Sequence, residues 1–209
     1  MSSEPNSLIV SYLTLRRVVG FLGVILPIVL ALWGFSLTNP PHLQASISAY
    51  YDLRTRDVFV GILFAISWFM FAYHGHDNRD NVAGYLAWLF ALGVALFPTN
   101  GTPREHIIHL ASATGLFLVL SYFSLRLFTL SRGFKTPQKV IRNRVYKTCG
   151  FVMLGCIALI TLYNLFGKGT ALDAWKPTFW LESIALWAFG ISWFVKGETL
   201  WRDPPAPLA

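Results

Sequence analysis

Long apolar stretches separated by short polar segments dominate the pattern of this sequence. Six of these stretches carry few charged residues. The hydrocarbon core of a membrane is about 30 Å thick, and a helix rises about 1.5 Å per residue, so roughly 20 residues cross it. The pattern therefore predicts six membrane-spanning helices, near Val18–Leu37, Asp57–Tyr73, Val82–Phe97, Glu105–Leu127, Val145–Phe166 and Phe179–Val195.

The predicted fold class is all-α, a polytopic transmembrane helical bundle of about six spans. One six-helix transmembrane domain covers residues 16–200. Residues 1–15 are expected to form an N-terminal polar tail or interfacial segment. Residues 201–209 are expected to form a disordered C-terminal tail, because three prolines within five residues exclude a helix.

The basic residues predict the orientation of these helices. Most of the 17 Lys and Arg residues fall on one side when the spans are threaded in order, and the segment Ser131–Lys147 holds the densest group. Cytoplasmic loops of membrane proteins are enriched in Lys and Arg. Both termini are therefore expected in the cytoplasm, for a multi-pass protein of a bacterial inner (plasma) membrane.

Composition supports a membrane location and narrows the partners. The chain is 55% hydrophobic and 13% charged, against about 25% charged residues in soluble domains. The net charge of +7 would suggest nucleic acid in a soluble protein. Here the basic residues lie in short loops between apolar stretches, so we expect membrane lipids as partners and no nucleic acid. A homo-oligomer is left open.

Polar residues at membrane depth are the candidates for chemistry, because an ionisable group inside a bilayer is costly. Glu182 follows Pro177 by five residues, about 7 Å along the helix axis, which is too deep for a first-turn cap. Other polar residues share its predicted depth in the outer leaflet. They are Asp57, Asn100, His106, His109 and Asn164. If their side chains converge, they form a polar pocket that opens to the outside.

The first outer loop is a second source of binding residues. Its Ser46, Tyr50 and Arg56, followed by Asp57, suit the recognition of a polar headgroup. Asp57 has a simpler explanation, because a carboxylate in the first turn of a helix is stabilised by the helix dipole.

The start of the fourth predicted helix combines a capping signal with two histidines. Thr102 followed by Glu105 predicts a capping box, with Pro103 at the favoured first helical position. His106 and His109 are three residues apart and could hold zinc together with Asp57 or Glu182. A single hydrogen-bonded histidine that faces another helix explains the same residues without a metal.

Between the second and third predicted helices, His74, His76, Asp77 and Asp80 could also ligate a cation. A tight turn with Asp77 or a neighbour capping the next helix explains these residues without a cofactor.

Several motifs resemble those of a family of uncharacterised bacterial six-span membrane proteins. They are Ser46-x-Ser-x-Tyr-Tyr, Arg56-Asp57-x-Phe-Val-Gly61, Ala95-Leu-Phe-Pro-Thr99, His109 and Phe189-Gly-x-Ser-Trp-x-x-Lys196-Gly. The architecture is more distantly similar to autophagy-modulator (DRAM-like) and Sfk-like membrane proteins. This resemblance implies a role in lipid organisation.

A second resemblance is to the superfamily of alkaline ceramidases and adiponectin-receptor-like proteins. These are hydrolases with a metal held by three histidines and with a nearby Asp and Ser. Asp57, His106 and His109 are similar to part of that set. The chain departs from it by having six predicted spans, no late His-x-x-x-His, and Glu182 in the last span.

Three functions follow from these observations. The first is binding of a lipid headgroup or small polar ligand in an outer-leaflet pocket. The second is a zinc-dependent intramembrane hydrolase, with His106, His109 and a carboxylate from Asp57 or Glu182 as ligands. The third is a proton-coupled transporter that uses Glu182. We expect the first of these functions, with the other two as alternatives that the sequence does not exclude.

Overall fold

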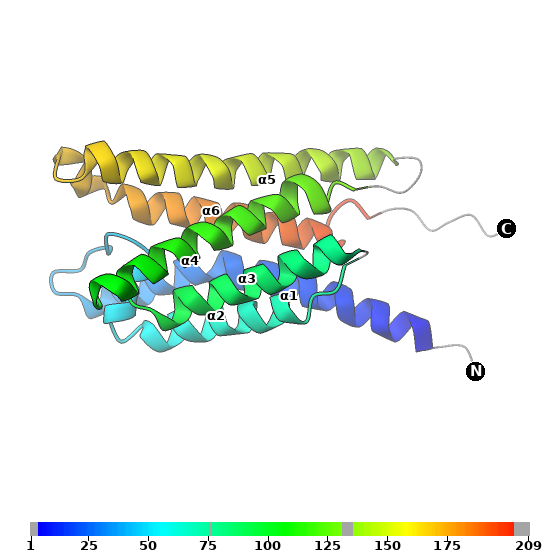
Figure 1. The fold of residues 1–209 in the computed structure, drawn as a ribbon, viewed down its shortest axis with the longest axis horizontal. Helices are drawn as coiled ribbons and strands as arrows, with labels where there is room; N and C mark the ends of the chain where they lie inside the picture. The colour runs from blue at the N-terminus through cyan, green and yellow to red at the C-terminus, as the bar shows by residue number, and fades with distance from the viewer. Residues whose placement is uncertain (1–3, 76, 131–135, 203–209) are drawn as a thin grey trace.

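The computed structural model describes residues 4–75, 77–130 and 136–202, with side chains from Tyr12 onward, and in these residues the fold is all-helical. Six long helices run along one axis (Figure 1). Their bounds are α1 Glu4–Leu37, α2 Arg56–Phe71, α3 Asn78–Leu96, α4 Pro103–Tyr122, α5 Pro137–Leu162 and α6 Pro177–Lys196. Short helical segments are η1 Ser48–Asp52, η2 Phe123–Leu127, η3 Tyr163–Gly167 and η4 Ala171–Trp175.

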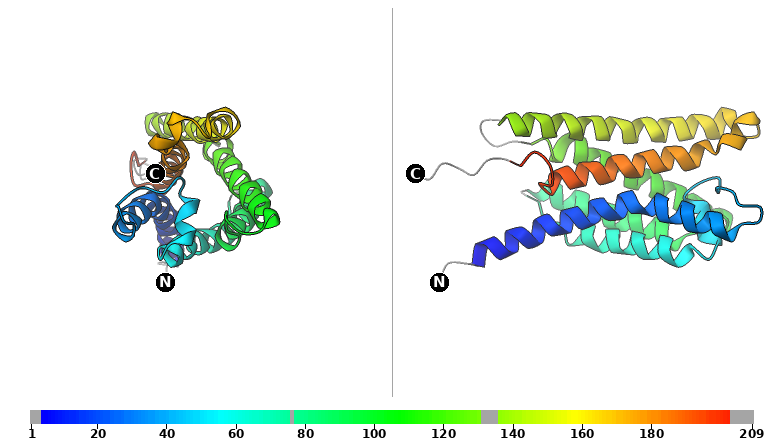
Figure 2. Two further views of the ribbon diagram at one scale, coloured as in Figure 1. Left: turned by 90° about the vertical axis from the view of Figure 1, so that its left-hand side faces the viewer. Right: turned by 180° about the vertical axis from the view of Figure 1, so that it is seen from behind.

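The six helices form a ring in chain order. Each helix packs against the next one, and α6 returns to pack against α1. The end-on view in Figure 2 shows this arrangement. Two glycines allow the closing contact, because a Cβ atom on Gly190 would lie 2.7 Å from the backbone oxygen of Gly20. The absence of side chains at both positions lets α1 and α6 approach closely.

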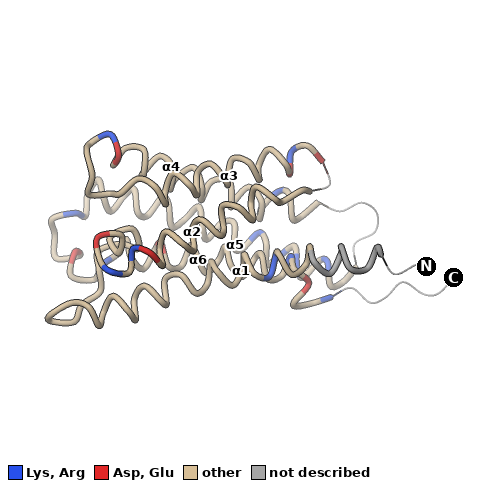
Figure 3. Tube along the Cα trace, turned by 90° about the horizontal axis from the view of Figure 1, so that it is seen from below, with Lys and Arg blue, Asp and Glu red and all other residues tan. Residues whose placement is uncertain are grey.

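The helices overlap the predicted spans, and four of the helical stretches suit a membrane. Each predicted range overlaps one helix, but α1 begins at Glu4 and α5 at Pro137, well before the predicted Val18 and Val145. Four helical stretches are long and apolar enough to cross a bilayer, namely Tyr12–Leu37, Pro103–Leu127, Pro137–Gly167 and Pro177–Lys196. The 16-residue α2 is shorter, and α3 begins with polar residues. The described Lys, Arg, Asp and Glu residues gather toward the two ends of the bundle (Figure 3).

The two ends of the bundle differ in their connections (Figure 1). One end, called the termini end, holds the start of α1, the α2–α3 turn and the end of α6. The other, called the η1 end, holds the α1–α2, α3–α4 and α5–α6 connections and therefore η1 and η4. Helix α1 begins at Glu4, within the range predicted as a polar or interfacial segment.

Two predicted caps fix the starts of α3 and α4. The hydroxyl of Thr102 accepts from the N–H of Glu105 at 3.3 Å, and the Glu105 carboxylate accepts from the N–H of Thr102 at 2.7 Å. This confirms the capping box. Asp77 caps α3 by accepting from the N–H groups of Arg79 and Asp80. His76 lies outside the described residues.

An aromatic cluster fills the core toward the termini end. Trp193 of α6 is fully buried, and its ring centre lies 5.3 Å from those of Tyr73 and Phe128 and 5.7 Å from that of Phe123. Edge-to-face contacts of this kind add to the stabilisation from burial alone. The cluster packs helices from opposite sides of the ring together, while the polar site described next lies toward the η1 end.

Candidate functional site

The segment between α1 and α2 folds back over the η1 end of the ring. Tyr50 is fully buried, and its ring centre lies 6.1 Å from that of Phe179 in α6. The backbone N–H of Phe179 donates to the carbonyl of Ala45 at 3.1 Å, and the hydroxyl of Thr55 donates to the carbonyl of Tyr50 at 2.9 Å. These contacts hold Ile47 and Ser48, both buried, at the centre of the bundle.

Glu182 meets this segment from α6. Its carboxylate accepts a hydrogen bond from the backbone N–H of Ile47 at 2.6 Å. A charged acceptor makes such a bond stronger than a neutral one does. The carboxylate therefore ties the loop to α6 through one oxygen, and the side chain also lines an internal cavity.

His109 of α4 meets the same segment from the other side. It is 1% exposed, and both of its ring nitrogens have partners. Nδ1 lies 2.7 Å from the carbonyl oxygen of Phe97, and Nε2 lies 2.9 Å from the hydroxyl oxygen of Ser48. A carbonyl oxygen carries no proton, so Nδ1 must be the donor. In the neutral imidazole, Nε2 is then the acceptor, and the hydroxyl of Ser48 donates to it.

A small cavity separates Glu182 from the apolar walls of the ring. It has about 40 Å³ of room for water-molecule centres, which is enough for a water or one small polar group but not for a whole phospholipid headgroup. Its polar lining comes from Glu182 and Ser48. The rest of the lining is apolar or backbone, from Leu26, Ile47, Phe59, Leu63, Val94, Ala113, Leu116, Phe117 and Leu186.

The hydrogen-bonding state of the two polar residues defines what the cavity can hold. Ser48 uses its proton toward His109, so its remaining capacity toward the cavity is as an acceptor. An ionised Glu182 offers only acceptors as well. With Glu182 ionised, the cavity presents two acceptors in apolar surroundings. The matching guest is a small hydrogen-bond donor, such as water, a hydroxyl group or a primary ammonium group.

Most of the other residues of the predicted outer layer do not join this site. Asp57 is exposed in the first turn of α2, where a carboxylate interacts favourably with the helix dipole. His106 is exposed, and its Nδ1 lies 2.7 Å from the carbonyl oxygen of Thr99. Asn100 donates to Asp52. The exposed Asn164 donates to the carbonyl of Ile160, one turn earlier in its own helix.

The predicted headgroup-binding residues of the first outer loop make contacts within that loop. The hydroxyl of Ser46 accepts from the N–H of Ala49 at 3.1 Å. The phenol oxygen of Tyr50 accepts from the N–H of Gln44 at 3.3 Å, and burial raises the pKa of this phenol. Arg56 donates to the hydroxyl of Tyr51 at 2.8 Å, with its guanidinium 4.4 Å from the ring centre. These three residues shape the loop that carries Ser48.

The four proposed zinc ligands do not form a metal-binding group. Among the described residues, no three His, Cys, Asp or Glu side chains gather with the geometry of a metal site. The physical reason is direction: His109 points into the bundle, whereas His106 and Asp57 are exposed. His109 moreover has its nitrogens engaged with Phe97 and Ser48. The structure gives the zinc hypothesis no support.

Ser48 belongs to the candidate site, and the sequence reasoning missed it. Ser46 was favoured in its place, although Ser48 belongs to the same Ser46-x-Ser motif. Both Ser46 and Ser48 lie in a loop, where no helical or strand periodicity indicates which of the two hydroxyl groups points into the bundle. Glu182 and His109 bond to backbone groups, the N–H of Ile47 and the carbonyl of Phe97. Every residue type has such groups, so the sequence does not reveal these partners.

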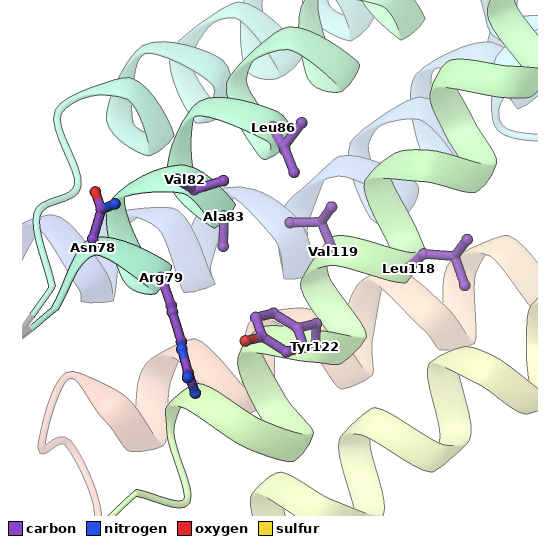
Figure 4. A pocket seen from close by; sticks show the side chains of 8 residues that line it. All are labelled: Asn78, Arg79, Val82, Ala83, Leu86, Leu118, Val119 and Tyr122. Carbon is purple, nitrogen blue, oxygen red and sulfur yellow. The ribbon is translucent and has the colours of Figure 1, made fainter.

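A larger hollow lies between α3 and α4 toward the termini end (Figure 4). It has about 430 Å³ of room for water-molecule centres. Val82, Leu86 and Leu118 give it apolar walls, and Arg79 extends along it beside Tyr122. Its lining holds no carboxylate and no histidine. The acid–base groups of the chain therefore point to the smaller, internal cavity as the candidate site.

Comparisons with known proteins give no information on the function of this chain. The resemblances drawn from the sequence motifs stay predictions. No protein-family model matches the chain, and no curated protein and no solved structure matches it.

Proposed function

We propose that the chain is a six-span integral membrane protein with both termini in the cytoplasm, in a bacterial inner membrane. The ring of six helices supports this span number, because α1 begins and α6 ends at the same end of the bundle (Figure 1). The basic residues support the orientation. Arg16, Arg79, Arg142 and Lys196 all belong to the termini end, the side on which the positive-inside rule expects them.

Within this frame, the protein binds the small hydrogen-bond-donating end of a membrane lipid at the site of Glu182 and Ser48. One observation carries this proposal: the two acceptors line one cavity in the interior of an apolar ring. An amphipathic guest satisfies both parts of this lining. Its donor group bonds Glu182 and Ser48, and the carbon atoms next to that group contact the apolar walls.

The size of the cavity discriminates among headgroups. A primary ammonium group is compact and has three N–H donors. Its positive charge balances the negative charge of the Glu182 carboxylate. A trimethylated ammonium group has no N–H donor and is larger. With about 40 Å³ available, we expect lipids that end in a primary amine or hydroxyl group to bind, and choline lipids to bind weakly.

The test compares two bilayers that differ only in the headgroup amine. The purified chain is placed in nanodiscs of phosphatidylcholine with or without phosphatidylethanolamine of the same acyl chains, and its thermal midpoint is measured. A ligand that binds only the folded state raises this midpoint. We expect phosphatidylethanolamine to raise it in the wild type and not in Glu182→Gln, which keeps an acceptor for the N–H of Ile47.

Asp57→Asn is the matched control, because Asp57 is an exposed carboxylate at the same end of the bundle. It should keep the full response to phosphatidylethanolamine. An equal response of the wild type to both lipids refutes headgroup recognition at this site. If only Asp57→Asn loses the response, the lipid binds at the surface of the η1 end, and the proposed site at Glu182 is wrong.

The pair Ser48 and His109 favours a second candidate function, acyl transfer or hydrolysis of a lipid. The carbonyl of Phe97 holds His109 in the tautomer whose Nε2 accepts from a serine hydroxyl, which is the arrangement of a nucleophile and its general base. In this reaction the Ser48 oxygen attacks an acyl carbon while its proton moves to Nε2. His109 then returns that proton to the leaving group, and a water releases the acyl chain from Ser48.

A fluorophosphonate probe tests this candidate, because it labels only serines that a neighbouring base activates. Labelling at Ser48 that disappears in His109→Ala supports it, and Ser46→Ala should label like the wild type, since Ser46 bonds only within the loop. If the wild type is unlabelled while the response to phosphatidylethanolamine persists, the site is a binding site.

A further inference from the structure

The hollow between α3 and α4 is a groove with a polar mouth and apolar walls (Figure 4). Arg79 and Tyr122 form the mouth, toward the termini end of the bundle. Leu86 follows Arg79 by seven residues in α3, about 10 Å along the helix axis. The antiparallel α4 contributes Leu118, one turn before Tyr122. The groove therefore runs from the termini end toward the middle of the bundle.

The walls of this groove suit an acyl chain. Val82, Leu86 and Leu118 are all exposed, and α4 belongs to a stretch that is long and apolar enough to cross a bilayer. Exposed apolar side chains of a membrane-spanning bundle contact lipid acyl chains. The groove has about 430 Å³ of room for water-molecule centres, which is in the range of sites that hold small organic ligands.

The mouth of the groove offers hydrogen-bond donors that the chain itself does not use. The described residues provide no acceptor for the guanidinium of Arg79, and only its backbone N–H is bonded, to the carboxylate of Asp77. The side chain of Arg79 extends along the groove beside Tyr122 (Figure 4). A guanidinium has five N–H donors and a phenol has one O–H donor. The mouth therefore presents donors and a positive charge.

The charge of the mouth selects the kind of headgroup. The described residues that line the groove include no carboxylate. A zwitterionic headgroup brings an ammonium group that finds no partner in this lining, whereas an anionic headgroup brings only the phosphate. Arginine is suited to phosphate, because its planar fork of N–H groups matches the phosphate oxygens. The groove is thus the converse of the cavity at Glu182, which presents acceptors.

We propose that the groove between α3 and α4 binds one anionic phospholipid of the cytoplasmic leaflet, with its phosphate at Arg79 and one acyl chain against Leu86 and Leu118. Arg79 lies in the first turn of α3, at the level where the proposed membrane orientation puts the cytoplasmic headgroups. Basic pockets between transmembrane helices on this side bind anionic headgroups. The proposal rests on that orientation and not on the site at Glu182.

The experiment is a lipid competition with the purified full chain. Nanodiscs contain equal amounts of phosphatidylcholine and phosphatidylmethanol with the same acyl chains, and native mass spectrometry weighs the lipids that stay bound. Phosphatidylmethanol is anionic, and its headgroup has no N–H or O–H donor for the cavity at Glu182. We expect the wild type to retain phosphatidylmethanol in excess, and Glu182→Gln to retain the same excess.

Two exposed arginines provide a matched pair of variants for the headgroup. Arg79→Gln should lower the excess about tenfold, the loss expected for one charge-assisted hydrogen bond. Arg144 is exposed on α5 toward the same end of the bundle and does not line the groove. Arg144→Gln removes the same charge from the surface and should retain the lipids like the wild type.

Two exposed leucines of α3 provide a matched pair for the acyl chain. Leu86→Trp fills the groove without changing any charge, so it should also lower the retention of phosphatidylmethanol. Leu89 is exposed on the same helix but does not line the groove. Leu89→Trp should therefore behave like the wild type.

Several outcomes overturn the proposal. Equal retention of the two lipids by the wild type does so, and so does an equal loss in Arg144→Gln and Arg79→Gln, which indicates attraction by the whole surface. If Leu86→Trp retains as much as Leu89→Trp, the acyl chain does not lie in the groove. If the chain is released as a dimer that Leu86→Trp dissociates, a second copy of the chain occupies the groove instead of a lipid. If Glu182→Gln loses the excess, phosphatidylmethanol binds at the other site.

Discussion

The contact that closes the helix ring gives a quantitative prediction. Replacing Gly190 by alanine places a Cβ atom 2.7 Å from the backbone oxygen of Gly20 and 2.5 Å from a methyl group of Val24. The side chain of Val24 can adjust, but the Gly20 oxygen belongs to the backbone of α1. Helices α1 and α6 must therefore move apart, and the contacts around this point loosen.

The expected cost follows from two opposing effects. Overpacking against a fixed backbone atom costs about 3 kcal/mol, toward the upper end of the usual range. Alanine recovers up to about 1 kcal/mol, because it loses less conformational freedom in a helix than glycine does. The net loss in the free energy of unfolding is about 2 kcal/mol. For a chain of this size, it lowers the thermal midpoint by roughly 4–8 °C.

Gly155→Ala is the matched control, because a Cβ atom there would meet nothing within 4 Å. It lies in α5 and faces outward, so only the gain in helix propensity remains. We expect its thermal midpoint to equal or slightly exceed that of the wild type, measured in the same detergent. If Gly190→Ala is as stable as Gly155→Ala, α1 and α6 do not meet at these glycines, and the closed ring is wrong.

Three further predictions concern local structure and topology. Thr102→Ala removes the capping box of α4 and should cost about 1 kcal/mol of unfolding free energy, measured against Thr161→Ala on an exposed position of α5. Ser48→Ala leaves the buried Nε2 of His109 without its partner and should cost about 1–3 kcal/mol. A double-mutant cycle with His109→Phe should then show a coupling energy, and additivity would contradict the hydrogen bond. Reporter enzymes fused to each terminus should both indicate the cytoplasm, and one periplasmic terminus would refute six spans.

The sequence predicted the helices well, because their signals are local. Each predicted apolar stretch overlaps one of the helices, although α1 and α5 begin earlier than predicted. The capping box of Thr102 and Glu105 was readable from two residue types at a fixed spacing. For α3 the sequence predicted an Asp or Asn cap, and the structure places this cap at Asp77. Each of these features depends on neighbours in the chain and not on the packing of distant helices.

The site was only partly predictable, because depth does not fix direction. Glu182 and Asn164 lie at similar predicted depths, yet Glu182 lines the central cavity and Asn164 is exposed. The partner of His109 is Ser48, which is 61 residues away and reaches it only because the first outer loop folds back into the ring.

The buried arginines toward the termini end show the same limit. From the sequence, Arg16 and Arg142 were ordinary topology signals, and nothing local marks them as buried. Their neighbours Arg17 and Arg144 have the same chemistry. Which arginine of each pair faces the interior depends on how α1 and α5 are rotated in the bundle.

The most direct test of the central claim is a lipid competition read by native mass spectrometry. The chain is released from nanodiscs that contain equal amounts of phosphatidylethanolamine and phosphatidylcholine, and the lipids that remain bound are weighed. We predict that the wild type retains phosphatidylethanolamine in excess and that Glu182→Gln retains both lipids equally. Equal retention by the wild type, or an unchanged excess in Glu182→Gln, would contradict a donor-binding site at Glu182 and Ser48.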